Sequence, residues 1–293
     1  EIASRREIPA MIVNGRATDE KSVRRFEWPI VRGVARRMFS QVSWVGAQDE
    51  VHAERFRRLG VAADRVVVTG SVKYDSADIA DTIEGQEALR DAMGIDASRP
   101  LWVCGSTGPG EEAVILDAYA RLIRDFPELQ IAIVPRKPER FDEVARLIVS
   151  RGYACLRRST GAPQLPENAV EPRPAWLGDT VGELRAFYSL AAIVFVGRSL
   201  VPMGGSDLME AAGLAKAILS GPHTENFAEV AALLTAANAI VVVRDASELA
   251  AGVAKLLGDA AERARMSRAA RATILERRGA TEKTVQRMLE FLF

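Results

Sequence analysis

The sequence of 293 residues predicts an α/β protein whose sheets are mainly parallel and doubly wound. Short apolar runs of Val, Ile, Leu and Ala alternate with longer amphipathic stretches along most of the chain. This alternation is typical of strand–helix–strand units with right-handed crossovers. Most of the runs are continuous in apolar character, as expected for parallel strands that helices cover on both faces. The length exceeds that of an average domain and favours two.

The predicted elements follow one another in a regular order. Strands are predicted over residues 10–13, 42–47, 66–69, 101–105, 131–135, 153–156, 175–177, 193–196, 217–219 and 240–243. Helices are predicted over residues 19–39, 49–59, 111–126, 138–151, 182–190, 207–214, 227–237 and 247–257, and residues 259–293 carry two more that separate at Gly279. The polar segment 71–98 interrupts this rhythm. We therefore expect a partial first domain over 1–80, a second domain over 81–275, and a C-terminal helix over 276–293 that could pack back on the first domain.

Composition and charge narrow the class of protein. Hydrophobic residues make up 48% of the chain and charged residues 27%, which fits an ordinary globular protein. The formal net charge is zero, which argues against a general polyanion binder and against a nucleic-acid partner. Cys104 and Cys155 lie far apart in apolar stretches, so a disulfide framework is not expected and a reducing compartment fits. The apolar runs all fall short of the roughly 20 residues that a membrane-spanning helix needs.

Residues 1–37 form a locally basic segment within this neutral chain. Its basic residues are Arg5, Arg6, Arg16, Lys21, Arg24, Arg25, Arg32, Arg36 and Arg37, and its acidic residues are Glu1, Glu7, Asp19, Glu20 and Glu27. One interpretation is a solvated helix face. The other is a surface that meets anionic lipid or an anionic acceptor.

The segments that follow the strands of the second half are the candidate functional site. They are "STGPGEE", "PRKPER", "GDTVGEL", "GRSLVPMGGSD" and "SGPHTENF". Ligands of open α/β sheets bind beyond the carboxyl ends of the strands, and the topology places all five segments at that edge. All five are rich in glycine, proline or charge, so we expect them to gather around one anionic ligand.

The first two segments supply hydroxyls and basic groups. Ser106 and Thr107 precede a helix predicted to begin near Glu111, which is either an anion-binding nest or an ordinary strand–helix turn. A guanidinium directly after the next strand suits a phosphate or a carboxylate, although a solvated helix start is the alternative. The residues concerned are Pro135, Arg136, Lys137 and Arg140.

The third segment has the spacing of a capping box. In such a box Thr180 begins the helix and Glu183 satisfies the backbone N–H of Thr180, with Gly182 between them. The same helix N-terminus could also face an anionic ligand. The two interpretations are compatible, because a cap positions the free N–H groups.

The fourth segment is the most informative. Gly204 and Gly205 let the backbone approach a phosphate, and Ser206 can cap the next helix so that its N–H groups point at the anion. Glu210 is predicted one turn into that helix, where a carboxylate suits two vicinal ribose hydroxyls. The alternative is a glycine turn followed by a surface glutamate. Asn226 is the polar candidate of the fifth segment.

We expect no metal and no cofactor. The two histidines, His52 and His223, are far apart in the sequence, and no cluster of His, Cys and carboxylates has the spacing of metal ligands. The sequence also suggests no Ser/His/Asp or Cys/His nucleophile.

These segments together resemble a family of GT-B glycosyltransferases, the enzymes that transfer 3-deoxy-D-manno-octulosonic acid (Kdo) from CMP-Kdo to a lipid A precursor. The resemblance extends over nearly the whole chain and is most specific in "IVPRKPERF", "LGDTVGELRAFYSLA", "FVGRSLVPMGGSDLMEAAGLAKAIL" and "GPHTENFAEV". It implies two Rossmann-like domains, the first incomplete here, and an inverting, metal-independent transfer within lipopolysaccharide biosynthesis. The implied partners are CMP-Kdo, the lipid A precursor and the membrane surface, which the basic first domain would meet at the cytoplasmic face of the bacterial inner membrane.

The resemblance also implies roles for particular residues. Arg136 and Glu183 would face the nucleotide or its phosphate, Glu210 the ribose, and Asn226 the donor sugar. The glycine turn would meet the phosphate. The full set of expected nucleotide- and donor-binding residues is Ser106, Thr107, Pro135, Arg136, Gly182, Glu183, Gly204, Gly205, Ser206, Glu210 and Asn226.

The sequence departs from the family pattern at three places. Ser206 and Asp207 stand where the family has His and Asn, Gly108 stands for the His of Ser-Thr-His, and Lys137 stands for the His of Pro-Arg-His. The carboxylate expected to act as general base would lie upstream of residue 1, which would leave this chain inactive on its own. Two alternatives follow: a catalytically impaired nucleotide-binding module, and a transferase for another nucleotide-activated sugar.

Overall fold

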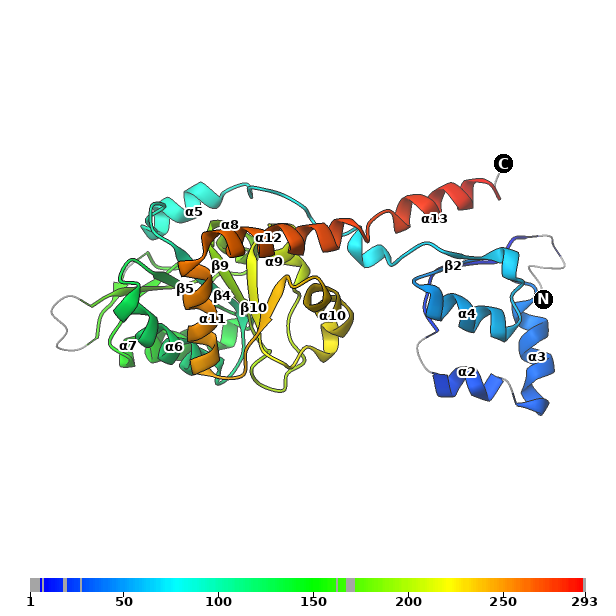
Figure 1. The fold of residues 1–293 in the computed structure, drawn as a ribbon, viewed down its shortest axis with the longest axis horizontal. Helices are drawn as coiled ribbons and strands as arrows, with labels where there is room; N and C mark the ends of the chain where they lie inside the picture. Colours follow the sequence, from blue (N-terminus) through cyan, green and yellow to red (C-terminus); the bar gives the residue numbers. More distant parts are fainter. Residues whose placement is uncertain are drawn as a thin grey trace. The chain divides into compact units, whose positions relative to one another are not determined.

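The structure is a computed structural model that describes residues 6, 8–17, 20–26, 28–161, 163–166 and 172–291 (Figure 1). The chain forms two compact units. Unit 1 consists of Glu1–Ala77 together with Leu275–Phe293, and unit 2 consists of Asp78–Ile274. Each unit has a parallel sheet of its own, so the predicted α/β class is confirmed.

Unit 1 contains a three-stranded parallel sheet in the order β1-β2-β3. Helix α4 covers it, and Phe56 and Leu59 of this helix pack with Val45 and Val66 of the sheet in a small core. Gly60 ends α4 in the left-handed conformation, with φ of 114°. The elements are β1 (Met11–Gly15), β2 (Trp44–Ala47), α4 (Glu50–Leu59) and β3 (Val66–Val68).

The single helix predicted over residues 19–39 is wrong. The structure has two helices, α2 (Glu20–Phe26) and α3 (Pro29–Phe39), and residue 19 lies outside the described residues. Trp28 is extended, with φ of −60° and ψ of 141°. The ring of Pro29 explains this break, because a proline disfavours the helical conformation in the residue before it.

The last helix of the chain, α13 (Ala280–Leu289), belongs to unit 1. Asp75 holds its N-terminus by accepting the backbone N–H groups of Gly279, at 2.6 Å, and Thr281, at 2.5 Å. Burial alone would raise the pKa of Asp75, but the hydrogen bonds of Thr281 and Gly279 outweigh it and hold the pKa below its ordinary value. These bonds connect the end of the chain with a segment some 200 residues earlier.

Unit 2 is built on an eight-stranded sheet in the order β11-β10-β9-β4-β5-β8-β6-β7. All neighbouring strands are parallel except β7, which pairs with β6 in the antiparallel sense. The chain runs outward from β4 in one direction and later crosses to β9 on its other side, which makes β4/β9 the point where the strand order reverses. The strands are β4 (Leu101–Thr107), β5 (Gln130–Pro135), β6 (Ala154–Arg157), β7 (Pro163–Gln164), β8 (Pro174–Leu177), β9 (Ile193–Val196), β10 (Ala217–Ser220) and β11 (Ile240–Val242).

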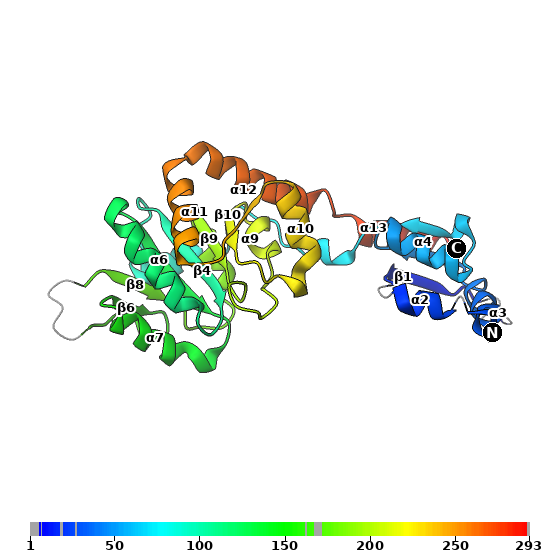
Figure 2. The same cartoon turned by 60° about the horizontal axis from the view of Figure 1, so that its bottom comes forward.

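Helices cover both faces of this sheet (Figures 1 and 2). One layer contains α6 (Glu111–Asp125), α7 (Phe141–Ser150) and α11 (Ala246–Gly258), and the other contains α8 (Leu184–Leu190), α9 (Met209–Gly213) and α10 (Ala228–Ala236). The core between the sheet and the first layer is fully apolar at its centre, where Ile131, Phe195 and Leu219 are completely buried. Helix α12 (Ala260–Leu275) follows α11.

All ten predicted strands are present, with ends shifted by up to two residues. The prediction missed the short strand β7 and helix α5 (Gln86–Met93), which packs near α8. Helix α5 lies in the polar segment 71–98 and buries only Leu89 and Met93, so its apolar stripe is too narrow to recognise. Among the described residues, no helix combines the length and the apolar character needed to cross a bilayer.

Candidate functional site

Two adjoining pockets lie at the carboxyl edge of the unit 2 sheet. The first, here called the polar pocket, has a volume of about 270 Å³ and is lined by Ser106, Arg136, Leu184, Arg198, Gly205, Ser206, Asp207, Glu210 and Phe227. The second, here called the apolar pocket, has a volume of about 70 Å³ and is lined by Ser106, Val134, Pro135, Arg136, Pro138, Phe141, Thr180, Val181, Gly182 and Leu184. Ser106, Arg136 and Leu184 belong to both.

The convergence predicted for the five segments is confirmed. Residues from the ends of β4, β5, β8, β9 and β10 all line the two pockets. The polar pocket lies at the β4/β9 reversal, where Ser106 is near the end of β4 and Arg198 follows the neighbouring β9. The helices after these two strands lie on opposite faces of the sheet (Figures 1 and 2). This is the place where open α/β sheets bind their ligands.

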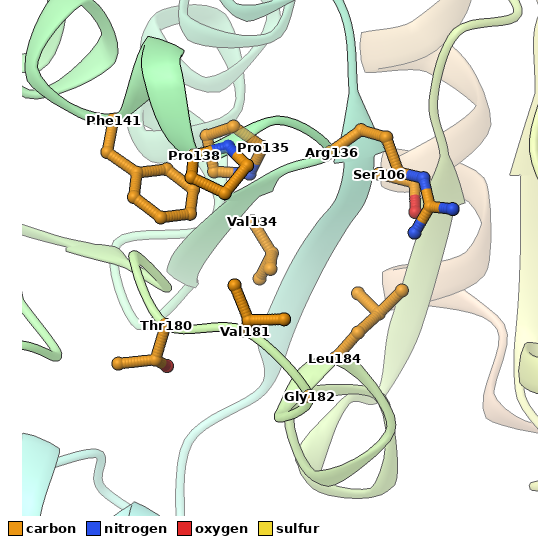
Figure 3. Close-up of a pocket in the computed structure, with 10 residues that line it drawn as sticks. All are labelled: Ser106, Val134, Pro135, Arg136, Pro138, Phe141, Thr180, Val181, Gly182 and Leu184. Carbon is orange, nitrogen blue, oxygen red and sulfur yellow. The ribbon is translucent and has the colours of Figure 1, made fainter.

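Figure 3 shows how the apolar pocket is built. Val134 of β5 and Val181 and Leu184 of the segment after β8 extend into the same space, and Phe141 lies on the far side. The side chain of Arg136 reaches to the end of the pocket at which Ser106 lies. A flat apolar group could therefore enter the apolar pocket while a charged group attached to it meets Arg136.

The turn after β4 holds an anion, but that anion is a side chain of the protein itself. The fully buried carboxylate of Glu111 accepts the backbone N–H groups of Gly108 at 2.8 Å, Arg198 at 2.5 Å, Ser199 at 2.7 Å and Leu200 at 2.8 Å. The nest interpretation of this turn is therefore corrected, because Glu111 occupies it. Glu111 instead ties the turn after β4 to the loop after β9.

Thr107 and Arg140 also serve the structure of this edge. Arg140 forms a bidentate ion pair with the buried carboxylate of Glu112, at 2.7 and 3.0 Å, and also pairs with Glu143. The hydroxyl of Thr107 donates to the same Glu112 at 2.7 Å. The hydrogen bond with Glu112 raises the pKa of Arg140 well above its ordinary value. Neither residue lines the polar pocket or the apolar pocket, so Arg140 does not extend the basic contact of Arg136 there.

The capping box predicted for the third segment is also wrong. Helix α8 begins at Leu184, so Glu183 occupies the N-cap position and makes no side-chain capping bond. Its carboxylate pairs with Arg158, at 2.9 Å, and accepts the hydroxyl of Thr180. Glu183 lies outside both pockets and lines a neighbouring one, whereas Gly182, with φ of 93°, lines the apolar pocket.

The two adjacent glycines are required by the packing of two loops. Gly204 and Gly205 have φ of 82° and 78°. A Cβ at Gly204 would lie 2.2 Å from the side-chain nitrogen of Asn226, and one at Gly205 would lie 3.0 Å from the carbonyl oxygen of His223. The N–H of Gly205 donates to the carbonyl of Arg198 at 2.8 Å, so it is not free for a phosphate. Asn226 donates its N–H to Gly204 and does not line the pockets, although the next residue, Phe227, does.

The beginning of α9 differs from the prediction in one detail. Ser206 does not cap the helix, because the N-cap residue is Leu208, which makes no side-chain capping bond. The carboxylate of Asp207 accepts the N–H of Met209 at 2.8 Å. The hydroxyl of Ser206 lies in the polar pocket. Glu210 lines the same pocket, where burial and then the neighbouring Asp207 raise its pKa, while Arg185 and Arg136 act in the opposite direction.

Sequence reasoning missed Arg198, the second arginine of the polar pocket. It follows β9 after a single glycine, much as Arg136 follows β5. A basic residue just beyond a buried strand was the signal that identified Arg136, and the same signal applies here. Among the described residues, no group of three or more His, Cys, Asp or Glu side chains is arranged to hold a metal ion.

The fold is of the GT-B type. A glycosyltransferase from Rickettsia africae has the same fold, with a TM-score of 0.55 at 14% identity over 99% of this chain and 79% of that one. The C-terminal CMP-Kdo-binding domain of WaaA from Acinetobacter baumannii matches with a TM-score of 0.58 at 27% identity, over 65% of this chain and 96% of that domain.

Sequence comparison finds similarity to one family in particular. A family model described as 3-deoxy-D-manno-octulosonic-acid transferase matches residues 1–76. The 3-deoxy-D-manno-octulosonic acid transferase of Haemophilus influenzae is 33% identical over 288 residues, which are 98% of this chain and 64% of that protein. The chain is therefore similar to Kdo transferases over nearly its whole length, and it spans 64% of the length of this relative.

Proposed function

We propose that this chain carries the donor-binding part of a metal-independent, inverting glycosyltransferase that moves Kdo from CMP-Kdo to a lipid A precursor in lipopolysaccharide biosynthesis. The observation that carries the proposal is the polar pocket at the β4/β9 reversal, where Arg136 and Glu210 lie beside an apolar pocket. Kdo transferase relatives that match nearly the whole chain support the choice of donor.

The two pockets suit the parts of a cytidine monophosphate. The apolar pocket is small, which favours the edge of a pyrimidine over a purine. Glu210 offers a carboxylate to the ribose hydroxyls, and Arg136, at the junction of the pockets, offers a guanidinium to the phosphate. When the bond to the sugar breaks, negative charge develops on that phosphate, and a fixed guanidinium stabilises it as a leaving group.

Transfer also needs a general base to deprotonate the acceptor hydroxyl. The polar pocket contains Asp207 and Glu210, but Asp207 accepts the N–H of Met209 and Glu210 is assigned to the ribose. Neither carboxylate of this pocket is therefore assigned as the base, and we propose that this chain on its own binds the donor without transferring Kdo. The alternatives, an impaired nucleotide-binding module or a transferase for another nucleotide-activated sugar, are outcomes of the experiment below.

The proposal is tested by calorimetric titration with CMP, UMP, GMP and AMP. We expect CMP to bind most tightly, and Glu210→Ala to weaken CMP by about 1–3 kcal/mol if its ribose hydrogen bonds form. Glu248→Ala is the matched control, because Glu248 lies on α11, away from both pockets, and pairs with Arg244 at the surface. Equal CMP affinity of the wild type and Glu210→Ala removes the ribose assignment, and a preference for a purine nucleotide or for UMP rejects CMP as the donor nucleotide.

We also propose that α3 of unit 1 meets an anionic membrane surface. Ile30, Val34 and Met38 are 89%, 61% and 63% exposed, and their spacing of four residues places them on one helix face. Exposed Arg32 and Arg36 lie on the same helix. An apolar stripe accompanied by arginines is typical of helices that lie in the interface of anionic membranes. Such a contact would fit a peripheral protein at the cytoplasmic face of the inner membrane.

Cosedimentation with vesicles tests this contact. We expect binding to phosphatidylcholine vesicles that contain phosphatidylglycerol, weaker binding without phosphatidylglycerol, and a several-fold loss on replacing Ile30, Val34 and Met38 together by serine. Replacement of the exposed Val51 and Val67 by serine is the control, because these residues lie elsewhere in unit 1. Equal binding of the triple variant and the wild type would reject α3 as the contact.

A further inference from the structure

Arg198 has a backbone conformation that arginine rarely adopts. Its φ is 58°, in the left-handed region that usually selects glycine. Ser106 has φ of 53° and lines the same polar pocket. Left-handed residues other than glycine persist where the surroundings hold them, and they gather at binding sites. Two such residues in one pocket indicate that the pocket is a binding site.

The surroundings of Arg198 fix it from several sides. Its backbone N–H donates to Glu111 at 2.5 Å, and its carbonyl accepts the N–H of Gly205 at 2.8 Å. A Cβ at Gly108 would lie 3.2 Å from Cγ of Arg198, so the glycine leaves room for the arginine stem. One terminal nitrogen reaches the carbonyl of Met203 at 3.4 Å. The guanidinium is therefore held at the wall of the pocket before any ligand binds.

Two hydrogen-bond donors at this wall have no partner in the part of the chain that the structure describes. They are Nε of Arg198 and the hydroxyl of Ser206, both of which are buried. Ser206 is only 8% exposed and lines the polar pocket next to Gly205. Buried polar groups are nearly always hydrogen-bonded, and leaving one without a partner destabilises the protein. A ligand with an acceptor group at this wall would satisfy both.

The two arginines occupy different positions. Arg136 follows β5 and lines both pockets, whereas Arg198 follows β9 and lines the polar pocket alone. The strand order β9-β4-β5 puts the strands that precede the two arginines on either side of β4, and Asp207 and Glu210 line the same polar pocket. A ligand with separate anionic groups for the two arginines and hydroxyls for the carboxylates would match this arrangement.

We infer that Arg198 and Ser206 form a subsite for the carboxylate of an acidic sugar, separate from the phosphate contact of Arg136. The inference rests on the proposed function, in which the donor is a CMP-linked sugar acid. Such a donor carries one charge on its phosphate and a second on the sugar carboxylate, and the CMP ester of a neutral sugar lacks the second. Arg198 thus determines that the transferred sugar is an acid, and its bidentate guanidinium matches the planar carboxylate.

The test compares CMP with CMP-Kdo in calorimetric titrations of the wild type, Arg198→Gln, Arg198→Lys and Arg136→Gln. We expect Arg198→Gln to weaken CMP-Kdo by at least about ten-fold and to change the affinity for CMP less than about two-fold. Arg198→Lys should retain part of the CMP-Kdo affinity, because it keeps the charge without the planar fork. Arg136→Gln should weaken both ligands.

Equal losses of CMP and CMP-Kdo in Arg198→Gln would overturn the inference, because Arg198 would then be a phosphate contact. Unchanged affinity for both would overturn it as well. In either case wild-type binding of CMP leaves the proposed function standing, whereas a wild type that binds neither ligand defeats the proposed function itself.

Arg198→Gly separates a ligand-binding role from a structural one. Glycine adopts positive φ without strain, so the melting temperature should stay the same or rise while CMP-Kdo binding falls as in Arg198→Gln. A lower melting temperature together with a loss of CMP binding would mean that Arg198 supports the fold, and the assigned subsite would be wrong.

Discussion

Glu111→Gln is expected to lower the free energy of unfolding of unit 2 by about 2–6 kcal/mol, because two backbone donors would lose their acceptor at about 1–3 kcal/mol each. The carboxylate of Glu111 accepts four backbone N–H groups, two on each oxygen. Glutamine keeps one oxygen but turns an NH₂ group toward the other pair of donors. Since Glu111 is fully buried, water cannot replace the lost bonds.

Urea unfolding of the wild type and Glu111→Gln measures this effect. Glu128→Gln is the control, because Glu128 pairs with Arg99 at the surface, where an ion pair contributes little. The variant should also bind CMP-Kdo more weakly, since Glu111 holds the loop that carries Arg198. A loss of stability within about 0.5 kcal/mol of the control would contradict the role of Glu111 as the acceptor that joins the two loops.

Arg140→Met is expected to destabilise unit 2 by about 3–5 kcal/mol, because it leaves a buried carboxylate without its counter-charge. The side chain of Glu112 is 1% exposed and that of Arg140 is 8% exposed. The ion pair itself can contribute less than this to the free energy of unfolding, because the loss of hydration on burying both charges offsets their attraction. The variant measures the penalty of one unpaired charge.

The double variant Arg140→Met/Glu112→Leu separates the two quantities. With both charges gone, most of the stability should return, apart from about 1 kcal/mol for the hydroxyl of Thr107, which loses its acceptor. A double variant as unstable as Arg140→Met would show that the ion pair itself, and not the unpaired charge, accounts for the loss.

The sequence predicted the sheet of unit 2 well, because its strands are buried on both faces and therefore appear as continuous apolar runs. The same reasoning located the site, since the carboxyl ends of parallel strands share one edge. Pro29 alone could have predicted the break between α2 and α3, because the residue before a proline disfavours the helical conformation. The prediction missed it because the mixture of basic and apolar residues is the same before and after Pro29. Helix α5 gave too weak a signal, because only two of its residues are buried.

The individual site residues were harder to predict, because their partners are distant in the sequence. Glu111 meets three of its backbone N–H donors 87 to 89 residues later, so a nest that is already occupied looks the same in the sequence as an empty one. The spacing of Thr180 and Glu183 satisfies the capping-box rule, but Arg158, 25 residues earlier, competes for the carboxylate. The chemistry of a loop can be inferred locally, whereas the choice among competing partners depends on the packed structure.

The internal carboxylate of Glu111 has a consequence for how this scaffold can diverge. The backbone of the loop after β9 is held by its hydrogen bonds to Glu111, which do not involve the side chains that line the polar pocket. Those side chains can therefore be replaced while the loop keeps its conformation. A new donor specificity would then require one or two replacements at positions such as Arg198 and Ser206. Evolution could in this way change the sugar that the site accepts without changing the backbone of the loop.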